Sequence, residues 1–167
     1  EARGAAVERF THAFAVQQGL EGLFSSLKDA ETGQRGYLLT GEERYLEPYT
    51  NARAAIPGEL KAVRTLTTNN VDQQQRMDNL EALSTEKMNG LEQTIALRRA
   101  GNTDAALGVI RSDRGKAVMD SLRALIENME SDERDRLASG QQDWEDAVAL
   151  SSRVTWGGSI VLIALLV

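Results

Sequence analysis

Apolar residues recur every three to four positions along almost the whole chain, and only short turn signals interrupt them. This spacing puts the apolar residues on one face of a helix. It predicts long helices over residues 2–39, 42–68 and 72–100, a short helix over 104–111, and a last long helix from about residue 113 onward. The sequence has no run of strictly alternating apolar and polar residues, the pattern that would indicate a strand.

Each predicted long helix has an apolar face, and the four faces together are the expected core. The composition agrees with long packed helices, because aromatic residues make up only 5% of the chain and Pro occurs twice. The expected core residues are Phe10, Phe14, Val16, Leu20, Leu23, Phe24, Leu27, Tyr45, Tyr49, Ala52, Ile56, Leu60, Val63, Leu66, Met77, Leu80, Leu83, Met88, Leu91, Ile95, Val118, Leu122, Leu125, Ile126, Met129 and Leu137.

The first turn follows Thr40 and Gly41. Gly41 is suited to a helix C-cap, and Thr40 with Glu43 three residues later predicts a capping box for the second helix. Pro48 and Pro57 fall inside that second helix, where each removes a backbone donor and is expected to bend or split it.

Two more turns are predicted at Asn69–Asn70 and at Gly101–Asn102, with Thr103 as the N-cap of the short helix. Short connections make successive helices antiparallel neighbours. We therefore expect an all-α protein, an antiparallel up-down-up-down four-helix bundle with long helices. The chain then enters and leaves the bundle at the same end.

The last fourteen residues, 154–167, carry no charge and are strongly apolar, with Trp156 near their start and Arg153 just before them. A spanning helix needs about 20 apolar residues, with aromatic and basic residues at its ends. We expect residues 154–167 to be the start of a transmembrane helix and residues 1–153 to form one extracytoplasmic domain. The alternative is a buried C-terminal core helix, which would normally carry a polar face.

Charge and composition exclude several functions. The net charge is −6 with acids and bases interspersed, so the basic patch that nucleic-acid binding requires is missing. The chain has no Cys, and its single histidine, His12, has no Glu three residues before it to form a metal-binding pair. We expect no metal site, no cofactor, no catalytic residue and no enzymatic activity in this segment.

The most informative stretch runs from residue 29 to residue 49. Gly33 and Gly36 lie inside a predicted helix, where glycine is costly but lets a neighbouring backbone approach closely. Arg35 can pair with Glu31 one turn earlier or bind a carboxylate or phosphate with two hydrogen bonds. Both a tight helix crossing and a ligand contact explain this stretch. The candidate ligand-binding residues are Glu31, Arg35, Tyr37, Thr40 and Tyr45.

This stretch resembles the CHASE family, type three. The run Glu-Thr-Gly-Gln-Arg-Gly-Tyr-Leu-Leu-Thr-Gly over 31–41, followed by Tyr45-Leu46 and Pro48-Tyr49, carries the resemblance. A second, weaker match is Arg114-Gly115-Lys116, followed by Met119-Asp120, Ile126, Met129 and Glu133. The resemblance covers roughly residues 20–140.

The resemblance implies a four-helix sensor domain outside the cytoplasmic membrane of a bacterium, held between two transmembrane helices of a receptor. The output domains of such receptors are histidine kinases, diguanylate cyclases or chemoreceptor-like modules. We accordingly expect a sensory input domain at the inner (cytoplasmic) membrane, periplasmic or extracellular, with an unidentified small-molecule or protein stimulus and a homodimeric assembly. The family implies no established ligand and no catalytic residues.

Two other readings stay open at this stage. The bundle could be a structural dimerisation module or spacer without its own ligand, in which case an apolar stripe outside the core is expected, with Phe10, Phe14 and Phe24 as candidates. A soluble four-helix protein of another class, such as a carrier, is also conceivable, but the charge-free C-terminus argues against it.

Overall fold

The chain folds into helices joined by short turns. The structure, a computed structural model, describes the backbone of residues 2–165 and the surroundings of the side chains from residue 4 to residue 139. No strand occurs in this described part, which confirms the prediction of an all-α protein. The elements, in chain order, are α1 (Ala2–Thr40), the 3₁₀ helix η1 (Glu43–Leu46), α2 (Glu47–Leu66), α3 (Val71–Arg99), α4 (Thr103–Arg111) and α5 (Arg114–Leu165).

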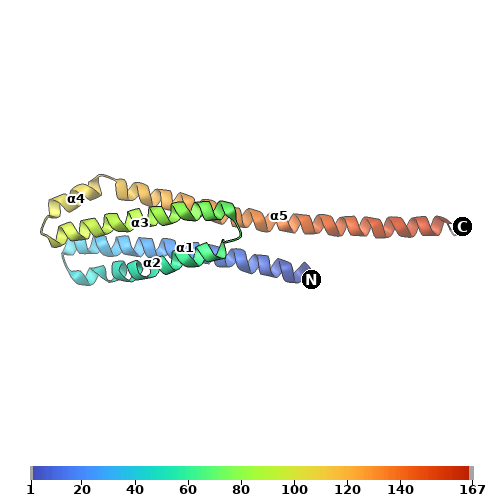
Figure 1. Ribbon diagram of the computed structural model, residues 1–167, viewed down its shortest axis with the longest axis horizontal. Coiled ribbons are helices and arrows are strands. Elements are labelled where there is room, and N and C mark those ends of the chain that lie inside the picture. Colours follow the sequence, from blue (N-terminus) through green and yellow to red (C-terminus); the bar gives the residue numbers. More distant parts are fainter. Residues whose placement is uncertain (1, 166–167) are drawn as a thin grey trace.

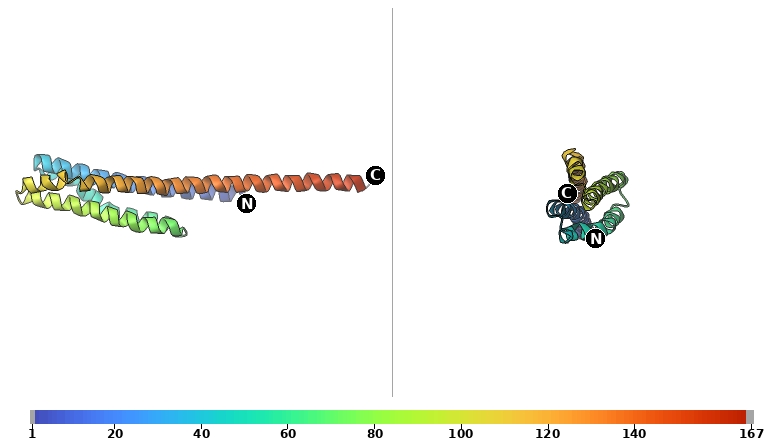
Figure 2. Two further views of the ribbon diagram at one scale, coloured as in Figure 1. Left: turned by 90° about the horizontal axis from the view of Figure 1, so that it is seen from above. Right: turned by 90° about the vertical axis from the view of Figure 1, so that its left-hand side faces the viewer.

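The helices α1, α2, α3 and α5 lie side by side, and the chain reverses direction between them (Figure 1). The short α4 lies at the end of the bundle where α1 meets η1. The N-terminus of α1 and the C-terminal part of α5 both point to the opposite end, and α5 extends well beyond the other helices (Figures 1 and 2). The two outer helices therefore leave the bundle on the same side.

The core runs along the bundle axis between these helices. Its largest fully buried side chains come from α1, α2, α3 and α5, and they include Leu20, Leu23, Leu27, Val63, Met77, Leu80, Leu122 and Met129. Burial of such side chains stabilises each by roughly 1.5–3 kcal/mol relative to exposure in water. The helices are held mainly by this packing rather than by helix propensity.

Two glycines bring the start of α2 very close to α1. A Cβ atom added at Gly33 would lie 2.9 Å from the backbone N of Tyr49 and 3.0 Å from the carbonyl O of Tyr45, and one at Gly36 would lie 3.0 Å from the Tyr45 ring. All three distances are shorter than the contacts that a Cβ atom normally makes. The in-helix glycines of the 29–49 stretch therefore make a tight helix crossing, one of the two explanations that the sequence left open.

The first turn differs from the predicted capping box. Thr40 is the last residue of α1, its hydroxyl donates to the Gly36 carbonyl at 2.8 Å, and it accepts a hydrogen bond from the Glu42 N–H at 3.1 Å. Gly41 has a φ of 74° and donates to the Tyr37 carbonyl, as a helix C-cap does. Thr40 thus belongs to the end of one helix rather than to the start of the next.

The prolines also act differently from each other. The predicted helix over 42–68 is divided into η1 and α2, and Pro48 occupies the first turn of α2, where its missing N–H costs nothing. Pro57 lies inside α2, which continues through it to Leu66. Pro48 therefore helps to begin the helix, and neither proline ends it.

The remaining turns are capped by asparagines. The Asn70 side chain accepts a hydrogen bond from the Gln73 N–H at 3.1 Å, and the Asn102 side chain accepts one from the Ala105 N–H at 3.3 Å. The predicted N-cap at Thr103 is wrong, because Asn102 fills that position and Thr103 is the first helical residue of α4. Asp113, just before α5, is in the left-handed region with a φ of 57°.

Three of the expected core aromatic residues, Phe10, Phe14 and Tyr45, are exposed, Tyr45 to 40%. Phe10 is 63% exposed and Phe14 53% exposed, and their stacked rings lie 6.5 Å apart. The buried face of α1 instead continues through Ala13 and Val16, one position away from the Phe10–Phe14 column. Phe24, in the same column, is only partly buried against the core.

The predicted start of a transmembrane helix, residues 154–167, falls where the side chains lie outside the described part. The backbone there is helical as far as Leu165, as part of α5. Among the helices of the described residues, none combines the length and apolar character that crossing a bilayer requires. The division into a domain of residues 1–153 and a membrane segment stays a prediction.

Candidate functional site

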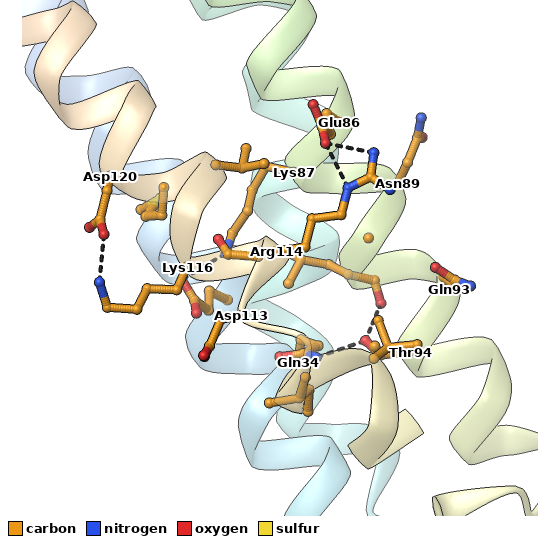
Figure 3. Close-up of a pocket in the computed structure, with 18 of the residues that line it drawn as sticks. Gln34, Glu86, Lys87, Asn89, Gln93, Thr94, Asp113, Arg114, Lys116 and Asp120 are labelled. Atoms are coloured by element: carbon orange, nitrogen blue, oxygen red, sulfur yellow. Dashed lines mark hydrogen bonds and ion pairs between the residues drawn. The ribbon is translucent and has the colours of Figure 1, made fainter. Parts of the chain in front are cut away.

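A large cavity opens between α1, α3, α4 and the first turns of α5, at the end of the bundle away from the chain termini (Figures 1 and 3). Its volume is about 1090 Å³. Ligand pockets for drug-sized molecules span roughly 300–1,000 Å³, so the cavity has room for a small ligand with its hydration. All the side chains labelled in Figure 3 are polar or charged, and they come from α1, α3, α5 and Asp113 just before α5.

The centre of the cavity wall is a buried ion pair. The side chain of Lys87 on α3 is only 2% exposed, and its Nζ lies 3.0 Å from Oε2 of Glu31 on α1. The same ammonium donates to the backbone carbonyl of Gly115 on α5 at 3.1 Å. A buried charge needs both a counter-ion and hydrogen bonds to be tolerated. Lys87 thus links three helices through one charged group.

Glu31 has a second cationic partner. Its Oε1 lies 2.6 Å from Nη2 of Arg35, one helical turn later on α1, while its Oε2 faces Lys87. The Glu31 side chain is 19% exposed, whereas Arg35 is largely in water. One carboxylate therefore neutralises two cations, and this small cluster keeps one positive charge in excess.

Neutral polar side chains continue the wall toward the end of the bundle. The amide of Gln34 on α1 donates to the Thr94 hydroxyl on α3 at 2.7 Å, and that hydroxyl donates to the Leu91 carbonyl at 2.8 Å (Figure 3). Gln34 and Thr94 are both almost completely buried. This hydrogen-bonded pair fixes the distance between α1 and α3 beside the cavity.

The first turns of α5 form the rim of the cavity. Nε and Nη2 of Arg114 lie 2.9 and 2.8 Å from Oε1 of Glu86, and Lys116 Nζ lies 2.6 Å from Oδ2 of Asp120 (Figure 3). Asp120 also accepts from Arg123 at 3.0 Å. The Lys116 hydrogen bond lowers the pKa of Asp120 and, in return, raises that of Lys116.

The lining as a whole carries more cations than carboxylates. The cationic lining residues are Lys28, Arg35, Lys87, Arg114, Lys116 and Arg123, and the acidic ones are Glu31, Glu86, Asp113 and Asp120. Six cations against four carboxylates leave the cavity positive in a chain whose net charge is −6. The excess arises because Glu31 and Asp120 are each shared by two cations.

Two of the five predicted ligand-binding residues, Glu31 and Arg35, line this cavity. The other three do not. Tyr37 is buried with the Arg99 guanidinium 5.9 Å from its ring, and Thr40 is at the exposed end of α1. Tyr45 covers Gly36 and lies under Arg44, whose Cζ is 5.3 Å from its ring. The structure thus divides the predicted set between a cavity and a helix crossing.

Arg99 belongs to the crossing rather than to the cavity. It holds Glu43 through two hydrogen bonds of 2.8 and 2.6 Å, which tie η1 to α3. The hydrogen bond from Arg99 lowers the pKa of the Glu43 carboxyl. Together with Tyr37, this pair supports the turn that η1 makes against α1.

Sequence reasoning missed Lys87, Gln34 and Thr94, although α3 carries a signal for two of them. The buried residues of α3 follow alternating spacings of four and three, and they include Met77, Leu80, Ser84, Lys87, Leu91 and Thr94. A lysine in register with apolar core positions predicts a buried charge that needs a partner. Gln34 occupies the equivalent buried column of α1, three residues before Tyr37.

The described residues contain no group of three or more His, Cys, Asp or Glu side chains able to hold a metal ion. His12, the single histidine of the chain, is exposed, and its Nε2 lies 2.8 Å from the Leu66 carbonyl. Its place is beside the turn between α2 and α3. It takes no part in the cavity.

These features describe a helical bundle with a charged interhelical cavity beneath its distal turns. The CHASE3 domain family matches residues 6–143, which is most of the chain. The chain belongs to this family, and the resemblance seen in the 31–41 run is confirmed. No curated protein matches the chain.

A solved structure has the same fold. The sensor domain of the histidine kinase HK9 from Rhodopseudomonas palustris is similar with a TM-score of 0.69 and 24% sequence identity. The similarity covers 74% of this chain and 97% of that chain. The two proteins share a helical bundle over the folded part.

Proposed function

We propose that this chain is the extracytoplasmic sensory input domain of a bacterial signalling receptor and that it takes its stimulus in the cavity between α1, α3, α4 and α5. Membership of the CHASE3 family supports the sensory role. The single observation that carries the choice of site is the buried Lys87–Glu31 pair, which connects α1 to α3 inside the cavity while Lys87 also holds α5. A ligand that competes for this pair changes how three helices are held together.

The route of the signal follows from the helices that the cavity touches. Both α1 and α5 line it, and both run to the opposite end of the bundle, where the chain enters and leaves (Figure 1). A ligand shifts an equilibrium between two arrangements only by its difference in affinity for them. In this proposal the bound and free states differ in the position of α5 relative to α1.

The proposal includes a membrane and a division of the chain. Residues 154–167 begin a spanning helix, residues 1–153 stand outside the membrane, and a cytoplasmic output domain follows. The apolar character of 154–167 and the family support this placement. The likeness to the sensor domain of a histidine kinase makes a histidine kinase the first output to test. A sensor domain is a non-catalytic module, and we propose that this segment performs no reaction.

A second function is favoured by the exposed Phe10 and Phe14. These rings, with Val7, form an apolar stripe on the surface of α1 toward its N-terminal end. Such a stripe suits a symmetric contact between two copies of the chain. The bundle then serves as a dimerisation module, either alone or together with the sensory role.

The receptor that contains this chain provides the test. Output is recorded over a panel of small solutes in the parent receptor and in Lys87→Met, with Arg53→Gln, an exposed ion-paired residue away from this cavity, as the control. We expect Lys87→Met to lose the response to the effective solute while Arg53→Gln keeps it. An unchanged response in Lys87→Met to every solute that activates the parent would contradict the proposed site.

A further inference from the structure

We infer that the cavity binds a small oxyanion, a molecule carrying a carboxylate or phosphate group. The inference rests on the proposed function for the site and adds the chemical class of the ligand. Three observations support it: the positive net charge of the lining, the single counter-ion that Lys87 shares with Arg35, and the exposure of the rim cations.

The first step is the net charge of the side chains that line the cavity. Six cationic and four acidic side chains line it, although the chain as a whole has six more acids than bases. Clefts lined by an excess of one sign of charge concentrate counter-ions of the opposite sign. An anion is therefore attracted to this cavity, while a cation is repelled from it.

The second step concerns the deepest cation. Lys87 has three N–H donors, and its partners are Oε2 of Glu31 and the Gly115 carbonyl. Glu31 is shared with Arg35, so Lys87 and Arg35 together have one counter-ion for two charges. A ligand carboxylate or phosphate beside this cluster supplies the second counter-ion. Because the Lys87 side chain is only 2% exposed, a charge–charge contact with its ammonium counts for more than a contact on the surface.

The third step concerns the rim. The side chains of Arg35, Arg114 and Lys116 are between 69% and 78% exposed, and their present partners are mostly exposed as well. Exposed ion pairs contribute only about 0–1 kcal/mol, so exchanging such a partner for a ligand costs little. Arg35 and Arg114 can each hold a carboxylate or phosphate through two parallel hydrogen bonds. The rim thus supplies exposed cations around the buried Lys87.

The neutral side chains limit the rest of the ligand. Asn89, Gln93 and Thr94 line the α3 wall beside these charges (Figure 3). They offer hydrogen-bonding groups next to the apolar lining residues Leu91, Val109, Ile110, Val118 and Met119. A polar oxyanion of metabolite size, with a short carbon skeleton that contacts these apolar residues, fits this lining.

The test measures thermal unfolding of the 167-residue chain with sodium succinate and with sodium phosphate as separate probes. Sodium chloride at equal ionic strength controls for screening, and succinamide, which has the shape of succinate without its charge, controls for the carbon skeleton. We expect at least one oxyanion to raise the midpoint with increasing concentration, as binding to the folded state requires. The two probes distinguish a carboxylate ligand from a phosphate ligand.

Single substitutions locate the site. Arg114→Gln and Arg35→Gln each remove one exposed rim cation, so both variants are expected to fold. Each variant should bind the effective oxyanion about tenfold more weakly, because one charge-assisted contact is lost. Arg53→Gln removes an equally exposed cation that pairs with Glu92 outside the cavity, and it should leave the affinity unchanged. An equal loss in Arg53→Gln would mean unspecific charge screening and would overturn the inference.

Other outcomes separate the inference from the proposed function. If neither oxyanion stabilises the chain beyond sodium chloride, or if succinamide acts as well as succinate, the cavity is not an oxyanion site and the inference is overturned. If an oxyanion binds with the expected loss in both cavity variants, the inference stands. In that case, an unaltered signalling response of the same variants would overturn the sensory role of the cavity and leave the oxyanion site intact.

Discussion

Lys87 is the residue on which the cavity depends, because its ammonium occupies a core position of α3. Its long apolar stem can pack among its neighbours while the charged end reaches Glu31 on α1 and the Gly115 carbonyl on α5. Replacing a buried ion pair with apolar residues is often neutral, whereas removing one partner leaves a buried charge without compensation. The two residues of the pair should therefore respond unequally to substitution.

Glu31→Gln should lower the free energy of unfolding by about 2 kcal/mol, less than the roughly 3–5 kcal/mol of a fully buried broken pair, because Glu31 is 19% exposed. Lys87→Met should change it by less than about 1 kcal/mol, and the double variant should recover most of the loss. Urea denaturation of the four proteins measures these values. Equal losses in both single variants would contradict the assignment of Lys87 as a buried charge that depends on Glu31.

Gly33 offers a second prediction at the same scale. A methyl group at this position would meet the Tyr49 backbone N at 2.9 Å, so Gly33→Ala should destabilise the chain by about 1–3 kcal/mol. Gly22 lies on the same helix with no heavy atom within 4 Å of its added Cβ, and Gly22→Ala should stabilise by about 0.5–1 kcal/mol. Thermal unfolding compares the two, and a stabilising Gly33→Ala would argue against the tight crossing.

At the scale of the helices, the sequence predicted well what depends on local pattern. The predicted third helix and the short helix agree with α3 and α4 to within one residue at each end, because turn residues such as Gly101 end one helix and Asn102 starts the next. The start of α2 was missed, since whether Thr40 closes α1 or opens the next helix depends on the close approach of Tyr45 to Gly36.

The same limit applies to the candidate site. Glu31 and Arg35 stood out from the sequence through their spacing, but their partner Lys87 is 56 residues from Glu31 along the chain. The exposure of Phe10 and Phe14 was equally hidden, because an apolar column one position away from the buried one has the same helical period. Both features depend on contacts between helices, and the apolar periodicity along a single helix cannot predict such contacts.

The cap of α3 gives a prediction that concerns a whole helix. Asn70 is largely buried and accepts a hydrogen bond from the Gln73 N–H, so Asn70→Ala should cost about 1 kcal/mol of stability. Its neighbour Asn69 is exposed and is not the N-cap, and Asn69→Ala should have little effect. Chemical denaturation of both variants checks the difference. Similar losses in the two variants would assign the effect to the turn in general rather than to the cap.

At the scale of the whole molecule, an apolar stripe on the surface of α1 indicates where two copies of the chain would contact each other. The stripe of Val7, Phe10 and Phe14 is exposed at the N-terminal end of α1, where residues 4–12 are all exposed and the buried face begins at Ala13. Exposed apolar patches on soluble domains commonly mark interaction sites. The proposed homodimer would use this stripe, near the end of the bundle where the chain enters and leaves.

The double variant Phe10→Glu with Phe14→Glu should convert a dimer of the chain into a monomer, because two like charges per copy would face each other across the symmetry axis. Leu39→Glu alters an even more exposed apolar residue at the other end of α1 and should leave the dimer intact. Sedimentation velocity over a range of concentrations measures the mass. A dimer that survives the double variant would place the interface elsewhere.

The length of α5 has a mechanical consequence. The helix runs for 52 residues from the cavity rim at Arg114 to Leu165, which at 1.5 Å per residue is about 78 Å. In a stiff rod of this length, a tilt of about 5° at the rim moves the far end by about 7 Å. A small tilt at the rim, such as one that accompanies the exchange of one ion-pair partner, therefore becomes a larger displacement at the far end of α5.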